Sequence, residues 1–325
     1  MTHDPSGESF PRWEGPQSPE YPVEFSTAPP PLPRRRDRFK DRRWLHVALL
    51  LLTVVTATLA GIRYYGSFAS DIGQHAARIS ILSGLWYALP VVLILGAHEL
   101  GHYVLCRRYN VDASLPYFIP APIGFTGTFG AVIRIREAFP TRAALFDIGV
   151  AGPIAGFVAL TPFLFWGLSL SRIIPLPKGV GQVAFGEPLL FKLATYLVFG
   201  PIRDGLALNA HPMVFAAWFG MLATALNLLP FGQLDGGHIS YAALGRYSTP
   251  VSVLTAGTAV VMTFVSTSWL LFTIIMLVML LAFGPSHPKV LYEEEEIGRG
   301  RQAIAIAALA MLVLCFTPVP IEFLQ

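Results

Sequence analysis

The chain has 325 residues, of which 54% are hydrophobic and 13% are charged, with a net charge of +3. A soluble domain carries about 25% charged residues, so this composition excludes an ordinary soluble protein and indicates an integral membrane protein. Most of the basic surplus lies at residues 34–43 (RRRDRFKDRR), directly before the first apolar stretch. That is where a membrane protein carries a cytoplasmic flank. No aromatic or groove-reading residues accompany the cluster, so a nucleic-acid interface is not expected.

A polar tail and a series of apolar stretches follow one another along the chain. Residues 1–43 are rich in proline and polar or basic residues and have no apolar period, which predicts a disordered cytoplasmic tail. The apolar stretch 189–200 is too short to span a bilayer, which takes about 20 residues, and predicts a surface or re-entrant helix. The expected fold is an all-α polytopic membrane protein with about six or seven transmembrane helices, in one domain over 44–325 with its core at 83–245. The spans are placed near 44–62, 83–106, 144–170, 212–231, 251–267, 268–284 and 302–318.

The basic residues also predict an orientation. Cytoplasmic loops carry an excess of Lys and Arg, so the N-terminus is expected in the cytoplasm, and the second span returns there at residues 107–108. The loop around Lys289, Arg299 and Arg301 is expected on the same side, and seven spans place the C-terminus outside. The predicted location is the cell (plasma or inner) membrane. The acidic run at 293–296 is interpreted as a solvated face.

Residues 114–142, between the second and third spans, break the helical pattern. The prolines and glycines of SLPYFIPAPIGFTGTFGAVIRIREAFPTR exclude a regular spanning helix, yet the segment is too apolar for an ordinary loop. Its stretch GTFGAVIRI alternates and is β-branched, which predicts a short membrane-embedded β-hairpin or re-entrant segment. Irregular backbone at membrane depth is tolerated only where protein covers it or where it lines a wet cavity. A cavity is therefore expected nearby.

The second span contains the pattern H-E-x-x-H at His98, Glu99 and His102. A spacing of four places both imidazoles on one helix face, where they can bind a single ion, and Glu99 beside them can polarise a water without being a ligand. At 1.5 Å per residue, the histidines lie roughly 7–14 Å from the boundary at Arg107. A chance match is the alternative. Polar side chains inside a spanning helix are costly and mark function, so the pattern predicts a metal site.

Catalytic zinc usually has three protein ligands and an open position for water, so one more ligand must come from elsewhere in the chain. Asp235, in NLLPFGQLDGGH, lies at the cytoplasmic end of the fourth span, on the side and at the depth of the histidines, and is the favoured ligand. Asp147, at the start of the third span, can instead stabilise the helix N-terminus through its negative charge. His238 is expected to orient a turn or cap a helix, or else to support the ligands. Two further candidates are expected on the outer side, namely Asp204 and His211.

The third span contains GVAGPIAGF, in which Gly152 and Gly156 form a small-xxx-small pair. Such pairs let helices approach closely. We expect this face to pack against the helix that carries the two histidines.

The motifs HELGH and NLLPFGQLDGG, with GTFG between them, resemble those of the site-2 protease family of intramembrane zinc metalloproteases. The stretch GTFGAVIRIREAFPTRAALFDIGVAGPIAGF is similar to the compact bacterial members and their plastid relatives. The resemblance covers residues 44–290. The chain has no insert long enough for the PDZ domain of larger members.

The resemblance implies a role for each motif residue. It implies one Zn2+ per chain, with Glu99 as the general base and Asn227 steadying the oxyanion or positioning the substrate. The segment that contains Gly127 and Gly130 would belong to a β element that receives the substrate. The implied zinc ligands are His98, His102 and Asp235.

The predicted activity is that of an intramembrane zinc metalloendopeptidase, and its expected partners are transmembrane protein substrates and the lipid bilayer. A helical substrate must unwind before cleavage, and an exposed strand edge near the zinc could pair with the freed backbone. A plain re-entrant plug is the alternative for that segment. An ion- or proton-coupled transporter would distribute polar residues through the bilayer and pair broken helices, whereas here they gather on one side. A catalytically inactive scaffold is disfavoured because all the expected residues are present.

Overall fold

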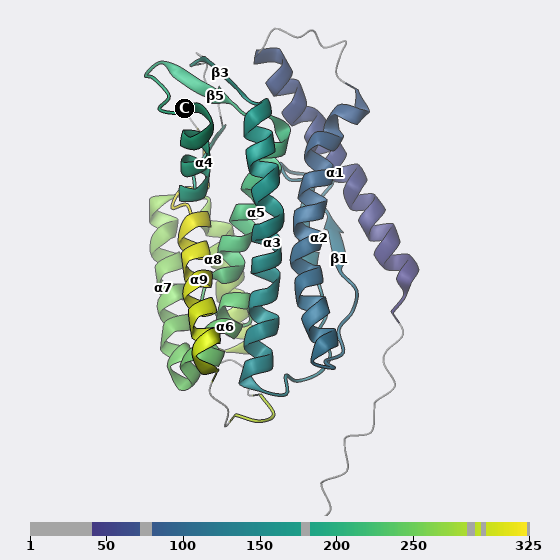
Figure 1. Cartoon of the computed structure of the whole chain (residues 1–325), viewed down its shortest axis with the longest axis vertical. Helices are drawn as coiled ribbons and strands as arrows, with labels where there is room; N and C mark the ends of the chain where they lie inside the picture. The colour runs from purple at the N-terminus through teal and green to yellow at the C-terminus, as the bar shows by residue number, and fades with distance from the viewer. Residues whose placement is uncertain (1–40, 72–79, 177–182, 285–289, 294–296, 324–325) are drawn as a thin grey trace, which may run out of the picture. The chain divides into compact units, whose positions relative to one another are not determined.

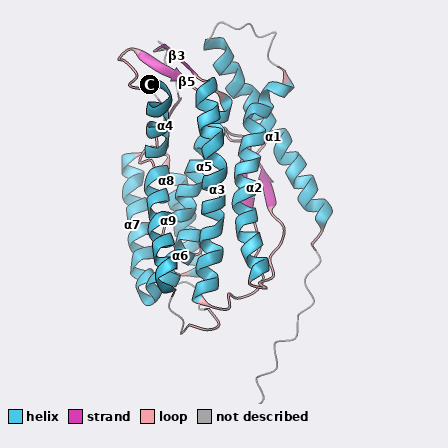
Figure 2. Cartoon of the chain, in the orientation of Figure 1, coloured by secondary structure: helices cyan, strands magenta, loops and turns pink. Residues whose placement is uncertain are grey.

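The computed structural model describes residues 41–71, 80–176, 183–284, 290–293 and 297–323. All of them belong to one compact unit over Lys40–Gln325. Helices make up most of these ranges, and the strands are short (Figure 1, Figure 2). The predicted tail lies outside the described residues apart from its last three, and so do Lys289 and residues 294–296 of the acidic run.

Every stretch predicted to span the membrane contains a helix, and so does the short stretch 189–200. The α-helices of the described ranges are α1 (Arg43–Asp71), α2 (Leu85–Arg108), α3 (Arg142–Leu170), α4 (Leu189–Phe199), α5 (Pro212–Leu228), α6 (Asp235–Leu244), α7 (Ser248–Val265), α8 (Trp269–Phe283) and α9 (Gly298–Cys315). Two short 3-10 turns are η2 (Ile81–Gly84) and η3 (Gly245–Tyr247).

The described residues hold five helical stretches that are long and apolar enough to cross a membrane. A polytopic membrane protein is therefore confirmed. Three further apolar helices of the described ranges are shorter, namely α4 with 11 residues, α5 with 17 and α8 with 15. The five stretches are Arg43–Ser70, Ile81–Arg108, Arg142–Leu170, Asp235–Val265 and Gly298–Cys315.

Helices α5 and α6 together follow the length of α3 in the opposite direction. At one end, an ideal Cβ at Gly167 of α3 would lie 2.8 Å from the Val214 side chain of α5. At the other end, Arg142 of α3 donates to the carbonyl oxygen of Ala242 in α6 at 2.6 Å. The predicted fourth span near 212–231 is thus interrupted after Leu228, and its course along α3 is completed by α6.

The chain reverses after α6, although α6 and α7 are contiguous in sequence. Gly245, directly after α6, has a φ of 57°, a left-handed conformation that glycine adopts without strain. Helix α7 then returns beside the α5–α6 break, where Gly232 N donates to Ser252 Oγ at 3.3 Å and Thr255 Oγ1 donates to Pro230 O at 3.3 Å. The stretch Asp235–Val265 is therefore two antiparallel helices in space.

Three antiparallel strand pairs lie among the described residues: β1–β2, β3–β5 and β4–β6. The last pair places the C-terminal strand beside the chain that follows α3. The strands are β1 (Tyr117–Pro120), β2 (Thr128–Val132), β3 (Arg172–Pro175), β4 (Val183–Phe185), β5 (Leu206–Asn209) and β6 (Ile321–Phe323).

Strands β1 and β2 pair antiparallel after α2, where the sequence predicts a hairpin. Strand β1 lies against α1, and β2 approaches α2. The pairing extends beyond the strands through a bridge between Ala113 and Ile135, close to the end of α2 at Arg108. The connecting loop reaches the other end of α2, where Tyr87 Oη donates to Thr126 O at 2.7 Å. The hairpin therefore runs along most of α2.

Candidate metal centre

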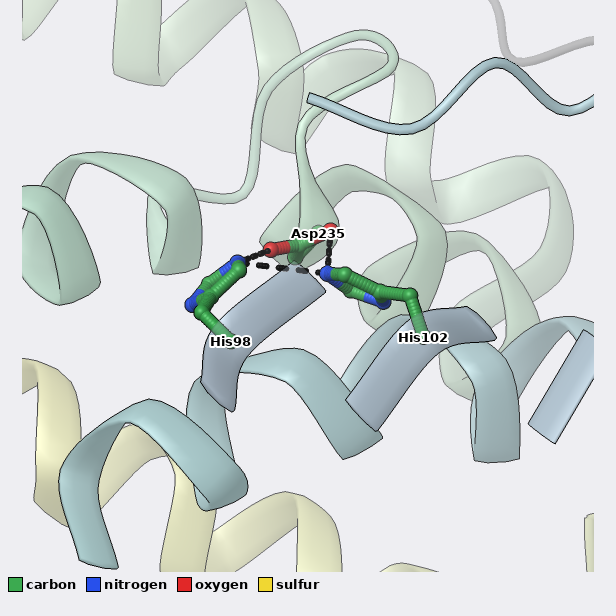
Figure 3. A group of neighbouring side chains, drawn as sticks. All are labelled: His98, His102 and Asp235. Carbon is green, nitrogen blue, oxygen red and sulfur yellow. Dashed lines mark hydrogen bonds and ion pairs between the residues drawn. The ribbon is translucent and has the colours of Figure 1, made fainter. Parts of the chain in front are cut away.

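Three side chains from two helices that are far apart in the sequence meet at one point (Figure 3). His98 and His102 project from α2, and Asp235 begins α6. His98 Nε2 lies 3.1 Å from Asp235 Oδ2, and His102 Nε2 lies 3.3 Å from Asp235 Oδ1. The two Nε2 atoms are 3.2 Å apart. The third ligand favoured from the sequence thus lies beside the two histidines.

A carbonyl of α3 fixes the ring of His102. His102 Nδ1 lies 2.7 Å from the carbonyl oxygen of Ile148. Because a carbonyl only accepts, Nδ1 carries the hydrogen and Nε2 presents its lone pair to the centre. Metal-binding histidines almost always make such a bond with the other ring nitrogen. Ile148 therefore prepares His102 to bind a metal through Nε2.

Glycines of α3 make room for both imidazoles. An ideal Cβ at Gly152 would lie 2.0 Å from His102 Nε2, and one at Gly156 would lie 3.2 Å from His98 Nδ1. The spacing of four on α3 thus matches the spacing of four on α2. The prediction that this small-residue face packs against the histidine-bearing helix is confirmed.

Asp235 reaches the histidines because the chain turns sharply before it. An ideal Cβ at Gly236 would lie 2.1 Å from Leu228 O, and one at Gly237 would lie 2.2 Å from Gly232 O. The two glycines after Asp235 are therefore required for this turn. Asp235 occupies the first turn of α6, where the helix N-terminus favours a negative charge.

A cavity of about 230 Å³ lies beside the three side chains. Glu99 lines it, is 8% exposed and lies outside the three-residue cluster. Ile133, directly after β2, lines the same cavity as Glu99. Asn227 also lines the cavity, with its Nδ2 3.3 Å from His98 Nε2. On the other side, the wall includes Ala131 and Val132 at the end of β2, so a strand edge lies beside the predicted metal and base.

Two of the other candidate ligands have different partners. Asp147 accepts hydrogen bonds from Arg301 of α9, Nε to Oδ1 and Nη2 to Oδ2 both at 2.8 Å, and another from Tyr109. It therefore connects α3 to α9. His238 lines the cavity, with its ring 5.5 Å from that of Phe139.

The remaining two candidates lie at the far end of the helices. His211 caps the start of α5 and packs against Trp86, next to the start of α2. Asp204 is exposed in the loop before β5. Neither is near the cluster, in agreement with their predicted location.

The two glycines of the predicted substrate segment have different surroundings. Gly127 has a φ of 68° and lies against α1, where an ideal Cβ would be 2.5 Å from Ala57 Cα. Gly130 has a φ of 110° with open space beside it, and it is next to the cavity residue Ala131. Only Gly130 is therefore adjacent to the cavity.

Sequence reasoning missed Ile148. It acts through its backbone carbonyl, a group that every residue type offers, so it leaves no signal of its own. The nearest signal for Ile148 was its position beside the glycine-rich face expected to pack on α2.

The donor set fits a catalytic zinc ion. One ligand atom from each of His98, His102 and Asp235 lies within 4.8 Å of the others. Two imidazole nitrogens and a carboxylate oxygen match a catalytic zinc site with three protein ligands. The adjacent cavity leaves access for a fourth ligand.

The fold and this centre define a membrane protein with a metallopeptidase-like site, and comparison with known proteins agrees. Residues 86–271 match the model of Peptidase family M50. The chain belongs to this family. The site-2 protease membership predicted from the motifs is confirmed.

Plant proteins are among the relatives. The chain is 31% identical over 274 residues to the probable zinc metalloprotease EGY2, chloroplastic, of Arabidopsis thaliana, covering 81% of this chain and 47% of that protein. It is 33% identical over 250 residues to EGY2 of Oryza sativa subsp. indica, covering 74% and 44%. Identity to the probable zinc metalloprotease EGY1, chloroplastic, of Arabidopsis thaliana is 32% over 240 residues, covering 71% and 42%. The chain spans less than half the length of these curated relatives. No solved structure matches the chain.

Proposed function

We propose that this protein is an intramembrane zinc metalloendopeptidase that cleaves the transmembrane segments of membrane-anchored proteins. The observation that carries the proposal is the meeting of Asp235 with His98 and His102 beside Glu99. The two histidines and Glu99 lie on a helix long enough to cross a membrane. Relatives named as probable zinc metalloproteases support the same activity. A peptidase family does not favour the transporter or scaffold alternatives.

The side chains divide the chemistry among them. His98, His102 and Asp235 hold one zinc ion, which supplies the Lewis acidity that activates water near neutral pH. Glu99, beside the cluster, accepts a proton from the attacking water and delivers it to the leaving amine. The Asn227 amide, on the cavity wall, donates a hydrogen bond to the peptide oxygen as negative charge develops there.

The β1–β2 hairpin is a membrane-embedded element that receives the unwound substrate. Among the described residues, β2 pairs with β1 alone, and its far end lines the cavity. A substrate strand that pairs with the free edge regains the hydrogen bonds it lost on unwinding. Gly130 lies on this edge as a substrate-contacting position, whereas Gly127 acts by anchoring the loop.

The chain crosses the membrane seven times, with α5 and α6 forming one interrupted crossing. Residues 44–325 form the protease domain, with the site in the core over 83–245, and residues 1–43 are a cytoplasmic tail. The excess of Lys and Arg at 34–43 supports a cytoplasmic N-terminus in a plasma or inner membrane. The relatives' names place those proteins in chloroplasts, so cell fractionation tests the location directly.

The decisive test replaces the proposed base. In Glu99→Gln the three ligand candidates remain, so purified protein should keep its zinc, while cleavage should fall by about two to four orders of magnitude. Quantitative proteomics of membranes from cells that express either form should show single-pass proteins accumulating uncut with Glu99→Gln.

The matched variant is Asp235→Ala, which removes a ligand and should lose both zinc and cleavage. Cleavage by Glu99→Gln at the wild-type rate would exclude Glu99 as the base. Full zinc retention by Asp235→Ala would place the third ligand elsewhere.

A further inference from the structure

The loop that connects β1 and β2 is held by its carbonyl groups. Four consecutive residues, 124–127, each offer a backbone oxygen to a side chain from α1 or α2. The pairs are Arg63 with Gly124 O, Tyr64 Oη with Phe125 O at 2.9 Å, Tyr87 Oη with Thr126 O at 2.7 Å, and Thr56 Oγ1 with Gly127 O at 2.6 Å. We call these four side chains the loop clamp.

The loop needs such partners because of where it lies. Tyr87 is buried, and the loop exposes Ile123 at 86% and Phe125 at 46%, side chains suited to lipid. In a bilayer an unpaired carbonyl costs several kcal/mol. The clamp therefore ties the loop to α1 and α2 at a fixed height.

Gly127 tightens this attachment. Gly127 packs directly on the backbone of α1. An ideal Cβ at this position would be 2.5 Å from Ala57 Cα and 2.6 Å from Thr56 O, so no side chain fits there. Its oxygen accepts from Ala121 N at 3.1 Å as well as from Thr56. The loop is thus in direct backbone contact with α1.

The same helix holds the other end of the hairpin. Asp41, two residues before the start of α1, pairs with Arg136. His46 Nδ1 lies 3.1 Å from Pro116 O, and the His46 ring is 4.0 Å from that of Tyr117. Helix α1 therefore supports the hairpin at both ends.

The supported strand is the one that borders the site. Strand β1 lies against α1, and β2 follows it with its far end at the cavity, whose wall includes both Ile133 and Glu99. A shift of the loop along α1 moves β2 relative to Glu99. We propose that Thr56, Tyr64 and Tyr87 are positioning residues that set the height of β2, and thereby the register in which a substrate strand pairs with its edge. The inference rests on the proposed function, in which this edge receives the substrate.

A register role differs measurably from a general contribution to stability. A strand that slips by two residues keeps the same side-chain face toward the site, whereas a slip of one reverses it. Loss of positioning should therefore add cleavage at bonds two residues away from the wild-type bond. A stability role would only lower the amount of active protein.

The test removes one donor at a time with Thr56→Val, Tyr64→Phe and Tyr87→Phe. The full chain in proteoliposomes is given a single-pass substrate that wild type cuts, and the products are mapped by mass spectrometry. We expect unchanged zinc content, a rate about two- to tenfold lower for each lost hydrogen bond, and new products offset by two residues. Thr56→Ser keeps the donor and should restore the single wild-type bond.

Thr53→Val is the matched control. Thr53 lies three residues before Thr56 on α1 and is fully buried, but its Oγ1 has no hydrogen-bond partner among the described residues. This variant should cut at the wild-type bond and rate.

Several outcomes would overturn the inference. If Thr56→Val and Tyr87→Phe cut only at the wild-type bond, the register role is excluded, whatever their cleavage rates. Loss of zinc in all three variants would show that the clamp is needed for folding and would exclude a specific register role. If only one variant loses zinc, the cleavage products of the other two decide whether the register role holds. If cleavage does not depend on Glu99, the proposed function itself fails. This outcome is distinguishable from failure of the register role, because it is seen with Glu99→Gln and without any clamp variant.

Discussion

His102 is the most constrained residue of the centre. Its Nε2 faces Asp235, its Nδ1 is bound by Ile148 O, and its ring edge lies where a side chain at Gly152 would stand. Helix α3 thus supplies both a hydrogen-bond acceptor and the space that the ring occupies. The zinc affinity of the site is therefore expected to depend on α3 as well as on the ligands.

Gly152→Ala tests this dependence. The added Cβ would stand 2.0 Å from His102 Nε2, so the ring must move from its ligand position. We expect zinc affinity to fall about 10- to 100-fold, the range seen when groups that orient a ligand are lost, as measured by competition with a chelator.

Gly257→Ala is the control for that variant. Gly257 also lies inside a helix, but an ideal Cβ there meets nothing within 4 Å. It should keep wild-type zinc affinity and be slightly more stable, since alanine is favoured over glycine in helices by about 1 kcal/mol. Equal zinc affinity in the two variants would show that α3 does not constrain His102.

The residues that could be predicted from the sequence are those whose chemistry is local. The pair His98 and His102 follows from helix geometry alone, and Asp235 from its depth relative to them. The surroundings of Gly127 could not be derived, because they depend on the approach of α1, about 70 residues earlier. A GTFG motif indicates unusual backbone but does not say which glycine contacts a helix and which faces open space.

At the scale of elements, the break between α5 and α6 determines where Asp235 lies. Because α5 ends at Leu228, the chain turns before Asp235, which becomes the first residue of α6. The sequence predicts the end of this crossing near residue 231. The continuation as α6 was not predicted, since DGGHISYAAL is too short and too rich in glycine to be recognised as half of a crossing.

Helix α9 packs against α3, α5 and α6, and one of its arginines also forms an ion pair near the metal centre. Arg301 binds both oxygens of Asp147, the residue before Ile148. Arg301→Ala should destabilise the protein by about 1.5–3 kcal/mol, the contribution of hydrogen bonds to charged groups. The measurement is the midpoint of thermal inactivation in detergent, which should be lower. A double-mutant cycle with Asp147→Ala should show that the two effects are not additive.

Arg299→Ala provides the comparison, because Arg299 is an exposed residue of the same helix. It should leave the midpoint unchanged. Additive effects of Arg301→Ala and Asp147→Ala would mean that the pair contributes nothing beyond its separate residues.

For the whole molecule, the strand pairs and ion pairs together indicate which ends of the helices share a side. Asp41 at the start of α1 pairs with Arg136, six residues before α3, and Arg301 near the start of α9 pairs with Asp147 near the start of α3. At the opposite ends, β6 after α9 pairs with β4 after α3. These contacts give α1, α3 and α9 the same direction, as seven crossings require.

This arrangement predicts the sidedness of two exposed residues. Arg42 precedes α1 and Asp204 lies between α4 and β5, so they should be on opposite sides of the membrane. The native Cys106 and Cys315 are buried and should give little background with a thiol reagent. In intact cells a membrane-impermeant maleimide should label Asp204→Cys and spare Arg42→Cys, whereas permeabilised cells should label both. Labelling of both in intact cells would contradict the number of crossings, and the inverse pattern would reverse the orientation while leaving the metal centre as described.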